Sequence, residues 1–134
     1  MDTEQQRELQ PGETATIELD QIPPSVNQIW RHRIMGKHTI TYKSAEGKEF
    51  NNTMGEAIPK WILPTDKQVM IEVDLYFPTH RRADVDNYMK AILDGMNKRI
   101  YNDDTQVTTL IINKYYAKSL PATKIQVSIH PTQQ

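Results

Sequence analysis

The chain has 134 residues, a length typical of one domain that buries its own core. It contains no cysteine, which excludes disulfides and thiolate zinc sites and favours a reducing compartment. No apolar run is long enough to cross a membrane, and the polar N-terminus lacks the pattern of a signal peptide. We therefore expect a cytoplasmic protein with no membrane association.

The net charge of −1 conceals an uneven distribution of acidic and basic residues. Residues 1–20 carry six acids and one base, whereas residues 21–134 carry 15 bases and 11 acids. The larger part is basic, as suits a protein that binds the phosphate backbone of nucleic acid. A mixed-charge surface is also ordinary, so charge alone does not establish such a partner.

The first half of the chain predicts one strand, one irregular segment and one helix. Residues 1–12 form a polar acidic tail, and we expect the domain to span residues 13–134. Alternating apolar residues predict a strand over Thr14–Leu19, which two prolines end. Residues 28–42 predict a loop or loose hairpin with a basic tip. Residues 44–58 predict a helix with Ser44 near its cap.

The second half alternates strands with a helix. Strict alternation predicts a strand over Val69–Phe77, and an apolar stripe of helical period predicts a helix from Asp84 to about Arg99. Two further strands are expected over Gln106–Tyr116 and Thr123–His130. This order predicts an α+β (mixed α/β) fold, in which one mixed sheet packs with two main helices.

Two acidic pairs are candidate metal ligands. Asp84 and Asp86 lie at the expected helix start, where one aspartate is an ordinary cap but two exceed what a cap needs. Asp103 and Asp104 lie in the turn before the next strand, where acidic residues are also common. Carboxylates without His or Cys suit Mg²⁺, with Mn²⁺ able to substitute. Because a helix of roughly 15 residues is about 22 Å long, the sequence leaves open whether the pairs meet.

Basic and amide side chains flank these acids. Lys90 lies four residues after Asp86, where it forms either a surface ion pair or a cation that stabilises charge on a phosphate. The candidate DNA-binding residues are Arg81, Arg82, Arg31, Arg33, Lys37 and Asn87.

Four segments of the chain resemble the RusA family of Holliday junction resolvases. They are RRADVDNYMKAILDGM at residues 81–96, NDDTQV at 102–107, PPSVN at 23–27 and SAEG at 44–47. The similarity covers about residues 22–130. The pairing of D-x-D-N-x-x-K with D-D-x-Q-V is specific, whereas D-x-D alone is not. Ala83 departs from the family, since a basic residue often precedes the first aspartate there.

The resemblance implies a homodimeric endodeoxyribonuclease that resolves four-way DNA junctions in recombination and repair, using Mg²⁺ and no nucleotide cofactor. It also implies that the acidic pairs converge. Asp84, Asp86 and Asp104 are then the catalytic metal ligands, with Asp103 as a neighbouring acid and Lys90 as the catalytic cation. Phages and prophages often carry such enzymes. The alternatives are a branched-DNA-binding protein without catalysis and a D-x-D enzyme that acts on a nucleotide-linked substrate.

Overall fold

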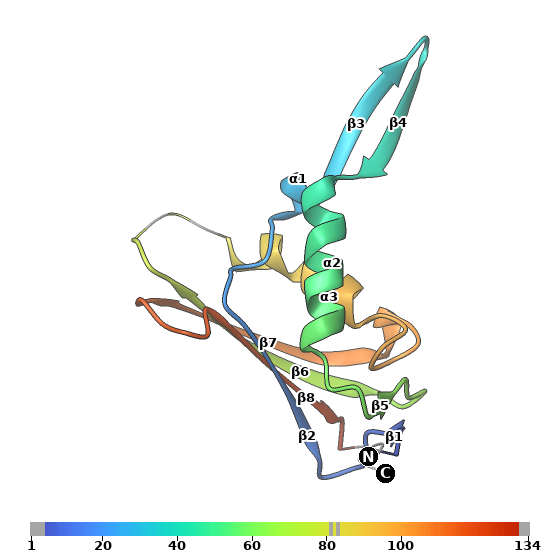
Figure 1. Ribbon diagram of the computed structural model, residues 1–134, viewed down its shortest axis with the longest axis vertical. Helices are drawn as coiled ribbons and strands as arrows, with labels where there is room; N and C mark the ends of the chain where they lie inside the picture. Colours follow the sequence, from blue (N-terminus) through green and yellow to red (C-terminus); the bar gives the residue numbers. More distant parts are fainter. Residues whose placement is uncertain (1–4, 81, 83, 132–134) are drawn as a thin grey trace.

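A four-stranded mixed sheet forms the centre of the protein in the computed structural model, which describes residues 5–80, 82 and 84–131. Its strand order is β2-β8-β6-β7, with β2 at Thr14–Leu19, β6 at Val69–Phe77, β7 at Val107–Tyr116 and β8 at Thr123–Ile129. Helices α2 (Ala45–Ala57) and α3 (Met89–Met96) cover one face of this sheet (Figure 1). The predicted α+β architecture, with one mixed sheet and two main helices, is confirmed.

The core lies between the sheet and these two helices. Every second residue of β6 is fully buried, as the period-two alternation predicts, and the sheet face so formed meets Phe50 and Met54 of α2 and Ile92 and Met96 of α3. The buried residues of β6 are Val69, Ile71, Val73, Leu75 and Phe77. The central strand therefore fixes the positions of both helices.

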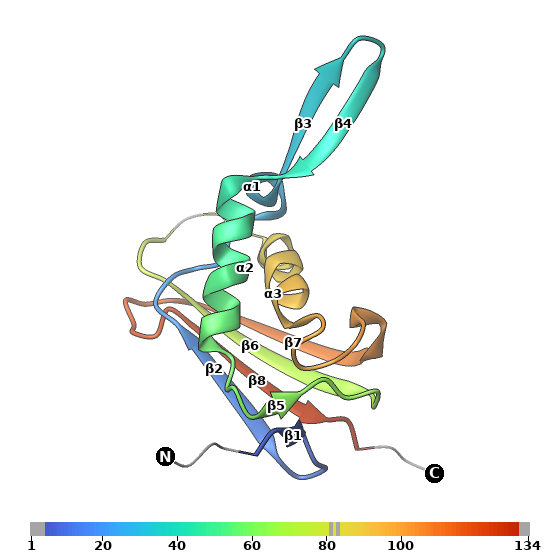
Figure 2. The ribbon, with the colours of Figure 1, turned by 45° about the vertical axis from the view of Figure 1, so that its right-hand side comes forward.

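The segment before α2 forms a projecting hairpin. Helix α1 (Val26–Ile29) leads into β3 (Trp30–Met35), which pairs antiparallel with β4 (His38–Lys43). The hairpin points away from the sheet and from both main helices (Figure 1, Figure 2). The predictions of a hairpin and of a helix capped by Ser44 are confirmed, since the Ser44 hydroxyl accepts a hydrogen bond from Gly47 N at 3.1 Å.

The predicted helix from Asp84 to Arg99 is wrong at both ends. Its first turn is the 3₁₀ helix η1 (Val85–Tyr88), and α3 ends at Met96. Lys98 has a φ of 65°, a left-handed conformation that terminates a helix. The tight turn that results keeps Ile100 and Tyr101 fully buried, which apolar periodicity alone did not indicate.

The N-terminal part of the described chain packs against the domain. Strand β1 (Arg7–Glu8) pairs parallel with β5 (Ile62–Leu63), and Leu9 is fully buried. Residues 7–9 of the segment expected to be a tail therefore lie on the domain. No helix in the described ranges is long and apolar enough to cross a membrane.

Candidate active site around the two acidic pairs

The two acidic pairs lie at opposite ends of α3. Strands β6 and β7 run parallel, so the chain leaves the end of β6, passes through η1 and α3, and returns to the start of β7. Asp84 and Asp86 follow the end of β6, whereas Asp104 precedes the start of β7. The intervening η1 and α3 together span about 20 Å, and Figure 2 shows this crossover above the sheet.

One chain does not gather the predicted metal ligands. Within residues 5–80, 82 and 84–131, no group of three or more His, Cys, Asp or Glu side chains is placed to hold a metal ion. The oxygen donors suit Mg²⁺ chemically, but a single chain does not assemble them. The ligand set of Asp84, Asp86, Asp103 and Asp104 therefore stays a prediction.

The D-x-D segment presents its carboxylates to solvent. Asp84 occupies the N-cap position of η1 but makes no side-chain capping hydrogen bond, and both Asp84 and Asp86 are exposed. The segment is held in place by Tyr88, whose ring packs edge-on against buried Phe77 at 5.5 Å between centroids. Helix capping therefore does not explain Asp84, because its side chain lacks the hydrogen bond that a cap makes.

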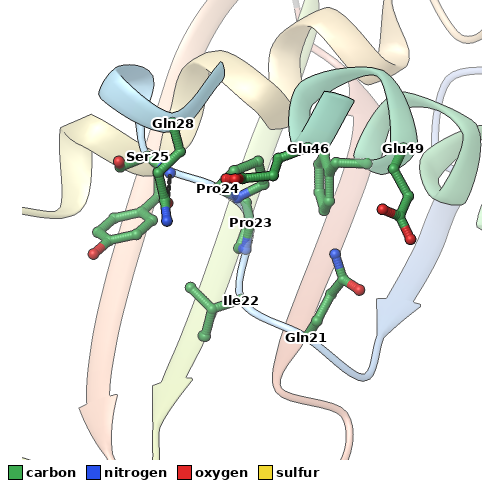
Figure 3. Close-up of a pocket in the computed structure, with 10 residues that line it drawn as sticks. Gln21, Ile22, Pro23, Pro24, Ser25, Gln28, Glu46 and Glu49 are labelled. Atoms are coloured by element: carbon green, nitrogen blue, oxygen red, sulfur yellow. Dashed lines mark hydrogen bonds between the residues drawn. The ribbon is translucent and has the colours of Figure 1, made fainter. Parts of the chain in front are cut away.

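A pocket of about 590 Å³ opens beside η1. Figure 3 shows that the segment Gln21–Ser25 faces Glu46 and Glu49 of α2 across this pocket, which Tyr88 also lines. The segments PPSVN and SAEG therefore lie close to the D-x-D segment. The lining holds two carboxylates and no basic side chain, so this pocket is not a site for phosphate.

Lys90 lies in the first turn of α3 and pairs with Asp94, one turn further along the helix. Its Nζ is 3.2 Å from Asp94 Oδ1, and the two side chains are 44% and 22% exposed. An i,i+4 pair of this kind contributes only about 0.3–0.5 kcal/mol. Lys90 can therefore exchange Asp94 for a phosphate oxygen at little cost.

The acids of the second pair have different environments. The Thr105 hydroxyl donates a hydrogen bond to Asp103 Oδ2 at 2.7 Å, whereas Asp104 lies half-buried beside Tyr101. Burial, followed by the charges of Asp104, Asp94 and Asp103, raises the pKa of the Tyr101 hydroxyl well above its ordinary value. Asp94, Tyr101 and the second acidic pair thus lie close together at the end of α3.

Gln106 organises this acidic turn, a role that sequence reasoning missed. Its side-chain oxygen accepts hydrogen bonds from the backbone N–H groups of Asn102 and Asp103, at 2.9 Å each. Its Nε2 donates to the carbonyls of Thr65 and Lys67, at 2.8 Å each. The glutamine of the D-D-x-Q pattern could have indicated this role in the sequence, and the structure shows that it positions the acidic turn.

Tyr101 and Arg99 fasten the turn to the helices. The Tyr101 hydroxyl donates to the carbonyl of Leu93 at 2.7 Å, and the whole side chain is buried. Arg99 Nη1 donates to the carbonyls of Gly95 at 2.8 Å and Asn51 at 3.1 Å. These bonds fix the distance between the acidic turn and α3.

The predicted DNA contacts fall on two regions. Arg82 is exposed before η1 and Asn87 is half-buried within it, whereas Arg81 lies outside the described residues. Lys37 is exposed at the hairpin tip. Arg31 and Arg33 belong to β3, with side chains outside the described part. Helix α1 at the hairpin base contacts η1, so the two regions are continuous.

Comparison with known proteins identifies the family. The family model described as Endodeoxyribonuclease RusA matches residues 21–128. Crossover junction endodeoxyribonuclease RusA of Escherichia coli strain K12 is 32% identical over 105 residues, which cover 76% of this chain and 80% of that protein. The crossover junction endodeoxyribonuclease of Enterobacteria phage 82 shows the same identity and coverage. The uncharacterized protein YqaN of Bacillus subtilis strain 168 is 42% identical over 52 residues, 39% of this chain and 36% of that protein.

The family match spans the acidic pairs, Lys90 and the PPSVN and SAEG segments, so the resemblance seen in the sequence is confirmed. The chain belongs to the RusA family and is an endodeoxyribonuclease.

Proposed function

We propose that this protein resolves four-way DNA junctions in recombination and repair by Mg²⁺-dependent hydrolysis of two symmetric phosphodiester bonds. The observation that carries the proposal is the pairing of uncapped, exposed Asp84 and Asp86 with Lys90 and Asp104 on one β-α-β crossover. The name of these relatives, crossover junction endodeoxyribonuclease, supports a four-way junction as the substrate.

The proposed metal ligands are the carboxylates of Asp84, Asp86 and Asp104, and Mn²⁺ can replace Mg²⁺ in such a set. A divalent ion bound there supplies water activation and charge neutralisation at the scissile phosphate. Asp103, whose carboxylate accepts the Thr105 hydroxyl, lies next to the set.

A second copy of the chain completes the site in this proposal. Strand β7 is the last strand in the sheet order, so one of its edges is unpaired in the described sheet. Its apolar side chains Leu110, Ile111 and Tyr115 are 37%, 43% and 43% exposed. Such an edge is a natural surface for a two-fold dimer, which would bury these side chains.

A two-fold axis beside β7 and perpendicular to α3 would set the α3 helices of the two copies antiparallel. The start of one α3 then lies near the end of the other, so Asp86 of one subunit approaches Asp104 of the partner subunit. Each dimer holds two such sites, which suits two symmetric cuts across a junction. Lys90, in the first turn of α3 beside the D-x-D segment, offsets charge on the phosphate, while Arg82 and Lys37 contact the DNA backbone.

Cleavage of a mobile four-way junction tests this function. We expect the wild-type protein to cut it with Mg²⁺ and to leave it intact in a chelator. Asp86→Asn should bind the junction and not cut it, because the amide removes a carboxylate ligand. Asp20→Asn, an exposed aspartate in the bend after β2, is the matched control and should cut normally.

Two outcomes separate this function from DNA binding without catalysis. Binding of an intact junction, with no cutting under any concentration of Mg²⁺ or Mn²⁺, would establish the non-catalytic alternative. Unimpaired cutting by Asp86→Asn would remove Asp86 from the ligand set.

A further inference from the structure

The hairpin of β3 and β4 is a projecting arm with a fixed base. The Ser44 N–H donates to the carbonyl of Ile29 at 2.6 Å, and Gly47 leaves so little room that a Cβ there would lie 3.0 Å from Ile29 Cγ2. Ser44 and Ile29 are 5% and 2% exposed. The first and last residues of the arm are therefore held between α1 and α2.

Beyond this base the arm extends away from the sheet (Figure 1, Figure 2). Each of its strands has six residues, which gives a length of about 20 Å. The strands are joined at Gly36 and Lys37, where Gly36 has a φ of 63° that favours glycine. A two-stranded ribbon fits the major groove of DNA, which is roughly 12 Å wide and 8.5 Å deep. Because the arm is longer than this depth, its tip can reach the base pairs at the floor of the groove.

The arm is positively charged, which favours DNA as its partner and disfavours a protein or lipid that carries basic groups. Residues 26–43 contain no acid, and their basic residues are Arg31, Arg33, Lys37 and Lys43. Such a segment is attracted to phosphates on either side of it. The charge explains why the arm approaches DNA, but it does not explain the apolar residue near its tip.

Ile34 is that residue. It pairs with Thr39 in the second residue pair from the turn, and its side chain is 78% exposed. An isolated exposed isoleucine needs no function on most surfaces. At the end of a basic arm that enters DNA, however, it matches the apolar wedges that other proteins insert between base steps.

We infer that Ile34 is a wedge that unstacks base pairs at the crossover of the junction. The inference rests on the proposed function, because the crossover is where the arms of a four-way junction exchange, and unstacking a base step there costs a few kcal/mol that the wedge must offset. It assigns the arm two roles: the basic residues bind the backbone, and Ile34 opens the branch point.

A junction with 2-aminopurine at the crossover measures the opening directly. The Asp86→Asn background keeps the DNA uncut during the measurement. We expect binding to raise the fluorescence, and Ile34→Ala to bind within about twofold of the parent while losing most of the signal. Ile34→Phe, a larger wedge, should keep the signal.

Two control variants separate the wedge from general effects. Leu120→Ala removes an apolar side chain that is 81% exposed in the turn between β7 and β8, and should leave the signal unchanged. Lys37→Ala should weaken binding to every DNA and lower the salt dependence by about one phosphate contact, without loss of signal at saturation.

Cutting provides the second readout. With Asp86 intact, Ile34→Ala should cut a fully paired junction about tenfold more slowly, yet cut a junction with unpaired bases at the crossover at the wild-type rate. Full fluorescence with Ile34→Ala would overturn the wedge while leaving the nuclease in place. A wild-type protein that binds and opens the junction without cutting would instead overturn the proposed function.

Discussion

Gly95→Ala tests the contact that sets the position of α3. Gly95 faces α2, and a Cβ built there would lie 2.6 Å from Met54 Cγ and 2.8 Å from Met54 Cβ. Carbon atoms in contact are normally about 3.5–4.0 Å apart, so the two helices would have to separate by about 1 Å. The Cβ of Met54 is fixed to its backbone, and a change of rotamer cannot relieve the clash.

Two opposing effects set the magnitude. Alanine is favoured over glycine inside a helix by about 1 kcal/mol, whereas overpacking a well-filled core costs about 1–3 kcal/mol. We expect a net loss of up to about 2 kcal/mol in the free energy of unfolding. For a chain of 134 residues this lowers Tm by up to about 7 °C, measurable by circular dichroism at 222 nm during thermal and urea unfolding.

Gly55→Ala is the matched control, because Gly55 lies inside α2 and gains the same helix propensity. Its added Cβ would meet Arg99 Nη2 at 2.9 Å, which is the far end of a flexible side chain. The Arg99 guanidinium would have to shift and would weaken its bonds to Gly95 and Asn51, which offsets the gain in helix propensity, so Gly55→Ala should be about as stable as the wild type. Equal stability of the two variants would refute the close approach of α2 and α3.

Three further substitutions test the site and its supports. Tyr101→Phe should lose about 1 kcal/mol at neutral pH with its bond to Leu93. Burial and nearby charges raise the Tyr101 pKa, so the stability of the wild type should fall as the pH rises above the ordinary value of 10.0. The stability of Tyr101→Phe should fall less steeply over the same pH range. If urea unfolding shows the same pH dependence of stability for both proteins, this prediction is wrong. Arg7 holds the pKa of Glu13 at about 2, below its ordinary 4.5, so the stability advantage over Glu13→Gln should be present above pH 4.5 and disappear as the pH falls toward 2. Lys90→Ala should slow single-turnover cutting about a hundredfold at unchanged junction affinity, and an unchanged rate would make it structural.

Local patterns predicted most of the fold. Strict alternation located β6, because a strand with one buried face has a period of two, and the Ser44 cap located the start of α2. The break after Met96 depends on the positive φ of Lys98 and on tertiary contacts of Arg99. Apolar periodicity carries no information about either.

The candidate site was predicted as a set of residues and not as an arrangement. The motif residues and the Lys90–Asp94 pair follow from spacing along a helix. The acidic pairs lie at opposite ends of α3 because one precedes the helix in the sequence and the other follows it, whereas the parallel pairing of β6 with β7, which keeps them apart, joins segments far apart in the sequence. Such pairing cannot be inferred from local spacing.

Mixing two inactive variants tests the shared site most directly. Asp86→Asn and Asp104→Asn should each be inactive on a four-way junction with Mg²⁺. After the subunits exchange, a mixed dimer has one site with both substitutions and one with neither, if each site takes Asp86 from one subunit and Asp104 from the other. We predict that an equimolar mixture regains cutting at roughly a quarter of the wild-type sites. A mixture as inactive as its parents, with exchange confirmed, would contradict a site built from two chains.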